Sequence, residues 1–378
     1  MEKKKVLFTA TVVKTHMMQF HLPYLRMFQE MGWETAVASR NDYEDPADCR
    51  IPYCDAYFDV PFERMPWKPG NIKAYRMLKK IIREGDYDII HCHTPVGAMI
   101  TRLAALGARK KGTKVIYTAH GFHFFKGAPL INWLLFFPAE WILAPVTDCL
   151  IAINKEDYAR AKSVMHPKRL EYVPGVGINT SRFHSTQEQR QEKRRELGFE
   201  EDDFLILTVA EMTPNKNHIT VLKAMQKLKG SREYEKMHYL IVGRGEMWES
   251  LEKSAAEMGI SDHVHFLGYR TDAAQLYGAC DLFAFVSFRE GLSVALMEAM
   301  SSGIGIVCTR IRGNTDLIEH GVNGHFTENN PDAVAENFLK MIRDPEYRLQ
   351  LGAGAAKTAM LYDEQNIHAR MKEIYLSM

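Results

Sequence analysis

Short apolar or β-branched runs alternate with segments of helical hydrophobic period along the whole chain. This alternation predicts βαβ units, in which helices join parallel strands and cover the sheet. In the first half the expected strands are residues 6–11, 34–39, 56–60, 88–94, 114–120 and 148–154. In the second half they are residues 204–211, 238–243, 263–268, 281–287, 305–310 and 324–328. The pattern therefore predicts an α/β protein with two parallel sheets.

A stretch with proline and glycine, LEYVPGVGINTSRFHS, separates the two sets of strands, and the highly charged TQEQRQEKRREL follows it. Such punctuation is typical of a domain boundary. We expect a first Rossmann-like domain over residues 1–184 and a second over residues 185–360. The last helical pattern comes after the second sheet is complete, so we expect residues 361–378 to pack toward the first domain. The length of 378 residues also fits two domains.

Composition narrows the partners and the compartment. The 48 basic and 47 acidic residues nearly balance, which argues against nucleic acid as a partner. The six cysteines lack zinc-binding spacing and are expected to be reduced thiols. The N-terminal MEKKKVLFTAT lacks the long apolar run of an export signal. Together these features favour a cytoplasmic protein.

One apolar segment, GAPLINWLLFFPAEWILAPV, is nearly long enough to cross a membrane. It contains Pro138 and Glu140, which argue against a transmembrane helix. Two interpretations stay open beside a transmembrane span: a helix buried in the core, and a helix that also touches a membrane surface.

The segment SFREGLSVALMEAMSSG follows an expected strand, and ligands of open parallel sheets bind at the carboxyl ends of the strands. If a helix begins near Ser293, the amides of Gly291, Leu292 and Ser293 converge where a diphosphate can bind. Glu290 in the loop and Glu298 about two turns into the helix could accept hydrogen bonds from sugar and ribose hydroxyls. The alternative is that Glu290 is a solvated loop residue and that Glu298 faces solvent.

Other candidate residues also follow expected strands. Lys216 comes after residues 204–211 and could bind phosphate oxygens, or could be a solvated lysine. His120 could donate to a sugar hydroxyl or cap its loop. His91 and His93 alternate on one strand, but a metal site would need a third ligand that the sequence does not indicate, so packing is the favoured interpretation.

The segment EGLSVALMEAMSSG places Glu290 and Glu298 in the E-x7-E signature of the retaining glycosyltransferases of family four, a group that includes bacterial exopolysaccharide and capsule enzymes. The chain resembles this family over its whole length. Further matching segments are TAHGFHFFKGAPLINWLL, DCLIAINKEDYARAK, VPGVGINTSRF, TVAEMTPNKNH, VHFLGYRTD and IRGNTDLIEHGVNG. The resemblance implies the GT-B fold, in which two Rossmann-like domains face a cleft and a C-terminal helix crosses back to the first domain.

The resemblance also implies roles for individual residues. Glu290, Lys216 and His120 would be catalytic, with Glu290 holding hydroxyls of the transferred sugar and Lys216 the diphosphate. Glu298 would bind the nucleotide ribose, and the acceptor would bind the first domain, where we assign His16. The remaining donor-binding residues would be Gly243, Gly268, Tyr269, Arg270, Gly291, Leu292 and Ser293.

Three positions depart from the family pattern. Glu211 stands where an arginine is common, so Lys216 has less help in binding phosphate. The loop TATVVKTHMMQFH replaces a glycine-rich loop, and Gly305 replaces a proline.

The expected reaction is hexosyl transfer with retention, from a UDP-hexose or UDP-N-acetylhexosamine to a saccharide acceptor in surface polysaccharide synthesis. No metal or other cofactor is expected, because Lys216 and the helix N-terminus can stabilise the leaving diphosphate. A UDP-sugar epimerase of GT-B fold and a non-catalytic nucleotide-sugar-binding protein are the alternatives.

We expect the acceptor to be lipid-linked, for example to polyprenyl diphosphate. The apolar segment lies near a basic group, a pairing that suits contact with the inner face of an anionic membrane. This group consists of Arg109, Lys110, Lys111 and Lys114. The same residues could instead form an ordinary solvated turn.

Overall fold

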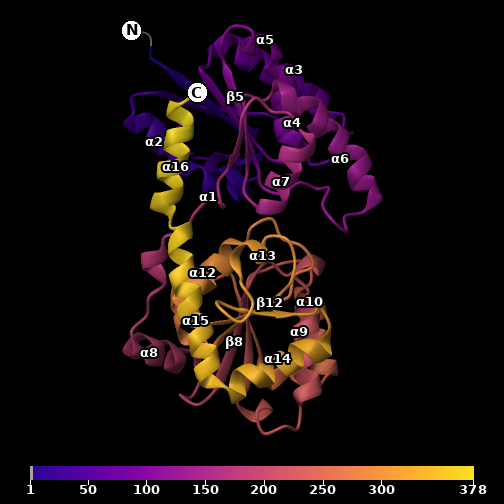
Figure 1. Cartoon of the computed structure of the whole chain (residues 1–378), viewed down its shortest axis with the longest axis vertical. Coiled ribbons are helices and arrows are strands. Elements are labelled where there is room, and N and C mark those ends of the chain that lie inside the picture. The colour runs from indigo at the N-terminus through magenta and orange to yellow at the C-terminus, as the bar shows by residue number, and fades with distance from the viewer. Residues whose placement is uncertain (1–2) are drawn as a thin grey trace. The chain divides into compact units, whose positions relative to one another are not determined.

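The computed structural model describes residues 3–378, and the chain divides into two compact units (Figure 1). Unit 1 comprises Met1–Val176 and His368–Met378, and unit 2 comprises Gly177–Ile367. The division comes after Val176 rather than after residue 184. Residues just past it belong to unit 2 because Ile178 exchanges backbone hydrogen bonds with the segment around Asp363.

Unit 1 contains a seven-stranded parallel sheet in the order β3-β2-β1-β4-β5-β6-β7. Its strands are β1 (Lys5–Val12), β2 (Glu34–Arg40), β3 (Ala56–Asp59), β4 (Ile89–His93), β5 (Lys114–Ala119), β6 (Cys149–Ala152) and β7 (Leu170–Tyr172). Its helices are α1 (Met18–Phe20), α2 (Leu22–Glu30), α3 (Gly70–Gly85), α4 (Pro95–Ala104), α5 (Leu106–Arg109), α6 (Leu130–Leu143), α7 (Lys155–Val164) and the part of α16 (Glu364–Leu376) from His368 onward. All residues of the central strand β4 are buried, as expected for a parallel sheet covered on both faces.

Unit 2 contains a six-stranded parallel sheet in the order β10-β9-β8-β11-β12-β13. Its strands are β8 (Phe204–Val209), β9 (Met237–Val242), β10 (Val264–Gly268), β11 (Leu282–Phe285), β12 (Gly305–Thr309) and β13 (His325–Thr327). Its helices are α8 (Gln187–Leu197), α9 (His218–Leu228), α10 (Trp248–Glu257), α11 (Ala273–Ala279), α12 (Val294–Ser302), α13 (Asn314–Leu317), α14 (Pro331–Arg343) and α15 (Pro345–Ala359). The charged segment after the boundary forms α8, which Thr186 and Gln189 cap reciprocally.

The strand order decides which loops meet in each unit. In unit 1, β1, β4 and β5 are consecutive neighbours, so the loops after their carboxyl ends lie together. In unit 2, β8 and β11 are neighbours, so the loop after β8 lies beside the loop after β11. Every expected strand is present, and β7 is an additional one.

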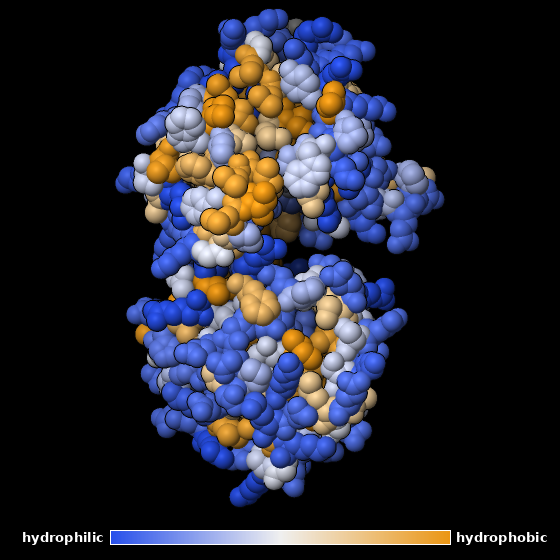
Figure 2. Space-filling model, turned by 90° about the vertical axis from the view of Figure 1, so that its right-hand side faces the viewer, coloured by the Kyte–Doolittle hydropathy of each residue, from blue (hydrophilic) through white to orange (hydrophobic). Residues whose placement is uncertain are grey.

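The apolar segment around residues 127–146 forms α6, and only Glu140 and Leu143 of this helix are buried. Glu140 accepts a 2.8 Å hydrogen bond from Arg102 of α4, so the one charge of α6 points inward. Leu134 and Ile142 are 71% and 63% exposed, and unit 1 shows large hydrophobic areas on the face in Figure 2. The interpretation of α6 as a buried helix is therefore wrong. No helix of the described residues is long and apolar enough to cross a bilayer.

Candidate active site

The start of α12 presents unpaired backbone amides. Ser293 is the N-cap residue, and its hydroxyl accepts a 3.3 Å hydrogen bond from the amide of Leu296. Within residues 3–378, no hydrogen bond is found from the amides of Gly291, Leu292 or Ser293. Free N–H groups at a helix N-terminus favour an anion. The expected convergence of these amides is therefore compatible with the structure.

The loop before α12 is held by the loop that follows β12. Gly313 has a φ of +83°, and a Cβ atom there would lie 2.5 Å from the carbonyl oxygen of Gly291, so only glycine allows this approach. Next to it, Nε of Arg312 donates a 3.2 Å hydrogen bond to the carbonyl oxygen of Glu290. Arg312 was missed as a candidate, although β12 is the sheet neighbour of β11 and its loop had to lie here.

Lys216 and Glu290 form the ion pair of this site. Nζ of Lys216 lies 2.7 Å from Oε1 of Glu290, and the two side chains are 22% and 11% exposed. The loops that carry them are also joined through Asn215, which accepts from the amide of Phe288 and donates to the carbonyl of Arg289. Glu290 is thus not a solvated loop residue. A cation, a carboxylate and free amides occur together at the carboxyl ends of β8 and β11.

Glu298 faces the protein and not open solvent. The hydroxyl of Tyr277 lies 3.1 Å from Oε2 of Glu298. Burial raises the pKa of Glu298, and the hydrogen bond from Tyr277 opposes this shift. A half-buried carboxylate with one hydrogen-bond donor retains lone pairs that can accept from further hydroxyl groups.

The loop after β10 holds the residues expected near the nucleotide base. Gly268 accepts a 2.8 Å hydrogen bond from the amide of Gly243, so these two glycines lie side by side. Tyr269 is 73% exposed, so its ring is largely open to solvent. Nε of Arg270 donates a 2.7 Å hydrogen bond to Oδ1 of Asp272, so this guanidinium already has an acidic partner. At Gly243 a Cβ atom would lie 2.0 Å from the carbonyl oxygen of Ala210, so this glycine serves the packing of neighbouring loops.

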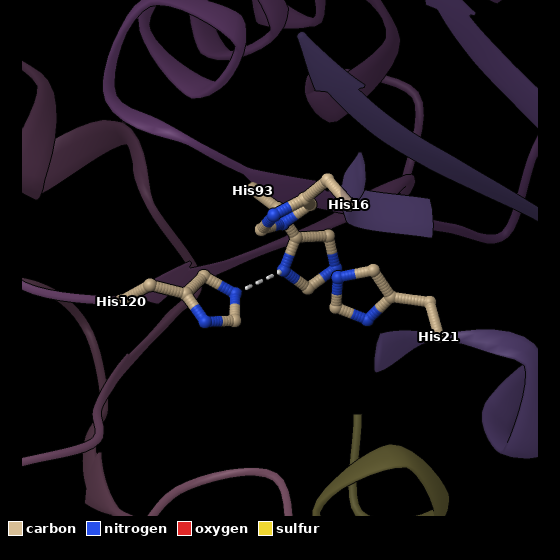
Figure 3. A group of neighbouring side chains, drawn as sticks. All are labelled: His16, His21, His93 and His120. Carbon is tan, nitrogen blue, oxygen red and sulfur yellow. Dashed lines mark hydrogen bonds between the residues drawn. The ribbon is translucent and has the colours of Figure 1, made fainter. Parts of the chain in front are cut away.

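In unit 1, His120 follows β5 and belongs to a group of four histidines (Figure 3). Its Nε2 lies 3.2 Å from Nδ1 of His93. His16 and His21 come from the segment after β1, and one ligand nitrogen of each histidine lies within 4.8 Å of all the others. The third possible ligand that the sequence did not indicate is therefore present beside His93.

His91 behaves differently from its neighbour His93. Its two ring nitrogens bond to the hydroxyls of Tyr375 and Thr118, both at 2.8 Å. The packing interpretation therefore fits His91, whereas the position of His93 beside three other histidines leaves a metal site open for it. Burial lowers the pKa of His120 to about 4, and burial together with neighbouring histidines lowers the pKa of His93 well below its ordinary value. Both imidazoles are neutral at pH 7.

A cavity of about 310 Å³ opens beside His16 in unit 1. Its lining includes Thr15, Arg64, His123 and Phe136. A guanidinium, a hydroxyl and aromatic rings offer contacts for a phosphate and for a sugar face.

Comparison with known proteins identifies both halves of the chain. Residues 5–154 match the family model described as "Glycosyl transferase 4-like", and residues 189–358 match "Glycosyl transferases group 1". "Putative glycosyltransferase EpsD" of Bacillus subtilis (strain 168) is 40% identical over 375 residues, which cover 98% of this chain and 96% of that protein.

A second relative is "UDP-Gal:alpha-D-GlcNAc-diphosphoundecaprenol alpha-1,3-galactosyltransferase" of Escherichia coli. It is 27% identical over 283 residues, which cover 72% of this chain and 71% of the relative. Among solved structures, Anabaena Alr3699/HepE in complex with UDP and glucose matches with a TM-score of 0.81 and 19% identity, over 99% of this chain and 100% of that chain. This likeness shows a shared fold.

Proposed function

Because this chain belongs to the group 1 glycosyltransferases and has the GT-B fold, we propose that it moves a hexosyl group from a nucleotide diphosphate sugar to a saccharide acceptor, with retention at the anomeric carbon. The observation that carries the proposal is the Lys216–Glu290 pair beside the free amides at the start of α12. The relative from E. coli carries UDP-Gal in its name, which supports a UDP-hexose or UDP-N-acetylhexosamine as the donor.

Each donor group has a matching partner in unit 2. Lys216 and the amides before α12 would bind the diphosphate. Glu298 would accept from the ribose hydroxyls, since the hydrogen bond from Tyr277 fixes its orientation. The exposed ring of Tyr269 would stack on the base. Glu290 would hold hydroxyls of the transferred sugar.

The chemistry needs stabilisation of the leaving diphosphate. As the bond between the anomeric carbon and the phosphate oxygen breaks, negative charge grows on that oxygen, where Lys216 and the helix N-terminus act. The acceptor oxygen forms the new bond on the same face, and its proton passes to the departing phosphate oxygen. Pairing with Lys216 makes Glu290 a poor nucleophile, which supports this front-face route over double displacement. Such a transfer needs no metal ion at the diphosphate.

Unit 1 would supply the acceptor site and His120. A neutral imidazole at His120 can exchange a hydrogen bond with a sugar hydroxyl. The cavity beside His16 would take the acceptor, with Arg64 suited to the phosphate of a polyprenyl diphosphate carrier. The diphosphoundecaprenol in the name of the E. coli relative supports this class of acceptor and a role in surface polysaccharide synthesis.

We also place this enzyme at the inner face of a membrane, through one surface of unit 1. Helix α4 packs against both α3 and α6, so these helices lie side by side. The α6 surface is apolar, with Leu130, Leu134 and Ile142 at 81%, 71% and 63% exposure. Next to α3 and α5 is a cavity of about 420 Å³ whose lining includes the cations Arg76, Lys79, Lys80, Arg83 and Lys111. Apolar and basic groups on one side suit an anionic bilayer.

One residue of the expected basic group does not contribute free positive charge to the proposed membrane surface. Arg109 is bound to Asp148 through two hydrogen bonds of 2.7 and 2.8 Å, so its charge is compensated. Lys110 and Lys111 are exposed, and Lys114 is half-buried.

Sedimentation with anionic liposomes at low salt tests the membrane contact. The Leu134→Glu variant should bind liposomes at least about tenfold more weakly, because it places a charge on the apolar face. Leu349→Glu is the matched control, since Leu349 is 67% exposed on unit 2. Equal binding of both variants and the unchanged protein would remove the α6 surface from the proposal.

The transferase activity is tested with a panel of nucleotide sugars and lipid-linked saccharide acceptors. Transfer that depends on both substrates is expected. Product formed from donor alone would identify an epimerase, and donor binding without turnover would identify a sensor. The Glu290→Gln variant should lose most activity, and nearly unchanged turnover would remove Glu290 from an essential role.

A further inference from the structure

Four histidines converge in unit 1 from parts of the chain that are far apart in sequence. His16 lies in the turn Val13–Met17 after β1, and His21 immediately precedes α2. His93 ends β4, and His120 follows β5. Figure 3 shows the four rings gathered around one place, and one ring nitrogen of each histidine lies within 4.8 Å of those of the other three. The neighbouring positions of β1, β4 and β5 in the sheet bring them together.

The cluster contains buried nitrogens without partners. Among the described residues, no hydrogen bond reaches Nε2 of His16, either ring nitrogen of His21, or Nε2 of His93. His21 and His93 are each only 1% exposed. Buried polar atoms of native proteins nearly always have a partner, and those of His91 do. A ligand that accepts one lone pair from each histidine would give partners to some of these nitrogens.

We propose that His16, His21, His93 and His120 bind one first-row transition-metal cation of the Zn²⁺ class. Neutral imidazole nitrogen is a preferred ligand of such ions. In its neutral form each imidazole offers one nitrogen lone pair to such an ion. The group contains no carboxylate, which argues against Ca²⁺ or Mg²⁺ as the ion.

The distances require only small movements for this coordination. With zinc–nitrogen bonds of about 2.1 Å, tetrahedral ligand atoms lie about 3.4 Å apart. Nδ1 of His93 and Nε2 of His120 are already 3.2 Å apart. The two ligand nitrogens that lie farthest apart would have to approach each other by at most about 1.4 Å. The rings of His21 and His93 are stacked with centroids 3.7 Å apart, so this pair must splay when both bind.

A metal here would fasten the segment after β1 to the ends of β4 and β5. It would do so entirely within unit 1, where none of the unit 2 groups proposed for the donor diphosphate takes part. His16 and His120 also have proposed roles with the acceptor and the transferred sugar, so a bound metal would compete with those roles, but its binding can be measured without a sugar donor.

The test uses the full chain without a histidine tag, freed of metal by a chelator. Zn²⁺ is titrated against a chromophoric competitor, and the zinc-loaded protein is studied by X-ray absorption. We expect one equivalent to bind at micromolar concentration or below, with a shell of nitrogen and oxygen that shows imidazole scattering. No bound equivalent, or a sulfur atom in the shell, would overturn the proposal.

Variants locate the site. His16→Ala should weaken binding at least about tenfold, because it removes one ligand. His16 is only partly buried, and thermal unfolding checks that the variant still folds. His166→Ala is the control, since His166 is an exposed histidine of the same unit. The zinc affinity of this variant should stay within about twofold of that of the unchanged protein. Unchanged affinity in a folded His16→Ala protein would refute the assignment.

Discussion

The Lys216–Glu290 pair makes two substitutions act in opposite directions on nucleotide binding. In the structure, Nζ of Lys216 is held 2.7 Å from the carboxylate of Glu290, which partly neutralises the cation before any phosphate arrives. Lys216→Ala removes the cation. Glu290→Gln removes the competing carboxylate and leaves Lys216 free for the diphosphate. We therefore expect weaker UDP binding in the first variant and tighter UDP binding in the second.

The size of each effect follows from the burial of the pair. A hydrogen bond to a charged group contributes about 1.5–3 kcal/mol, so Lys216→Ala should weaken UDP binding about 10- to 150-fold. Two unit charges 4 Å apart interact by about 4 kcal/mol near a protein surface. The side chains retain 22% and 11% exposure, so screening reduces the repulsion between Glu290 and the phosphate. About 1 kcal/mol, or about fivefold tighter binding, is expected for Glu290→Gln.

Isothermal titration with UDP measures both changes without knowledge of the acceptor. Turnover provides the second measurement, and Glu290→Gln should reduce it about 100-fold, since Glu290 acts on the transferred sugar and not on UDP. Lys223→Ala serves as the control, because Lys223 is an exposed lysine of the neighbouring helix α9. If Glu290→Gln weakens UDP binding as much as Lys216→Ala does, the competition between carboxylate and phosphate is refuted.

Two further predictions concern the stability of unit 1. Glu140→Ala should lower the free energy of unfolding by about 3–5 kcal/mol, because Arg102, only 1% exposed, would lose its acidic partner. The double variant Arg102→Met/Glu140→Met should recover most of this loss. Urea unfolding measures both variants, and equal stability of the single and double variants would contradict the argument. Burial lowers the pKa of His91 to about 3 and of His120 to about 4, so the unfolded chain binds more protons than the folded one below pH 6.5. The stability that these two neutral imidazoles contribute is therefore fully present above pH 6.5 and is lost as the pH falls toward 4. A urea midpoint that stays constant between pH 7 and pH 5 would disprove this.

The strands were predictable because a buried parallel strand needs a continuous apolar run. Each short run that we interpreted as a strand became one. The exception is β7 at Leu170–Tyr172, whose residues are all half-buried at the edge of the sheet. A three-residue edge strand needs no apolar run, so the pattern had no signal for it.

The candidate residues could be located singly, but their partners could not. Lys216 and Glu290 were predictable as residues that follow strands, whereas their contact depends on β8 lying next to β11. The inward direction of Glu140 depends in the same way on Arg102, which lies in a different helix. His21 was missed because it follows no strand directly. A prediction of strand order from the Rossmann topology would have placed its segment beside His93.

The division of unit 1 into two stretches of chain has a consequence for protein synthesis. Residues 368–378 complete this unit, and Tyr375 supplies the hydroxyl that satisfies buried His91. A ribosome makes these residues after unit 2, so the first domain leaves the exit tunnel with Nδ1 of that imidazole still unsatisfied. Unit 2 is one uninterrupted stretch and can finish folding earlier. The domain that is translated first is therefore completed second.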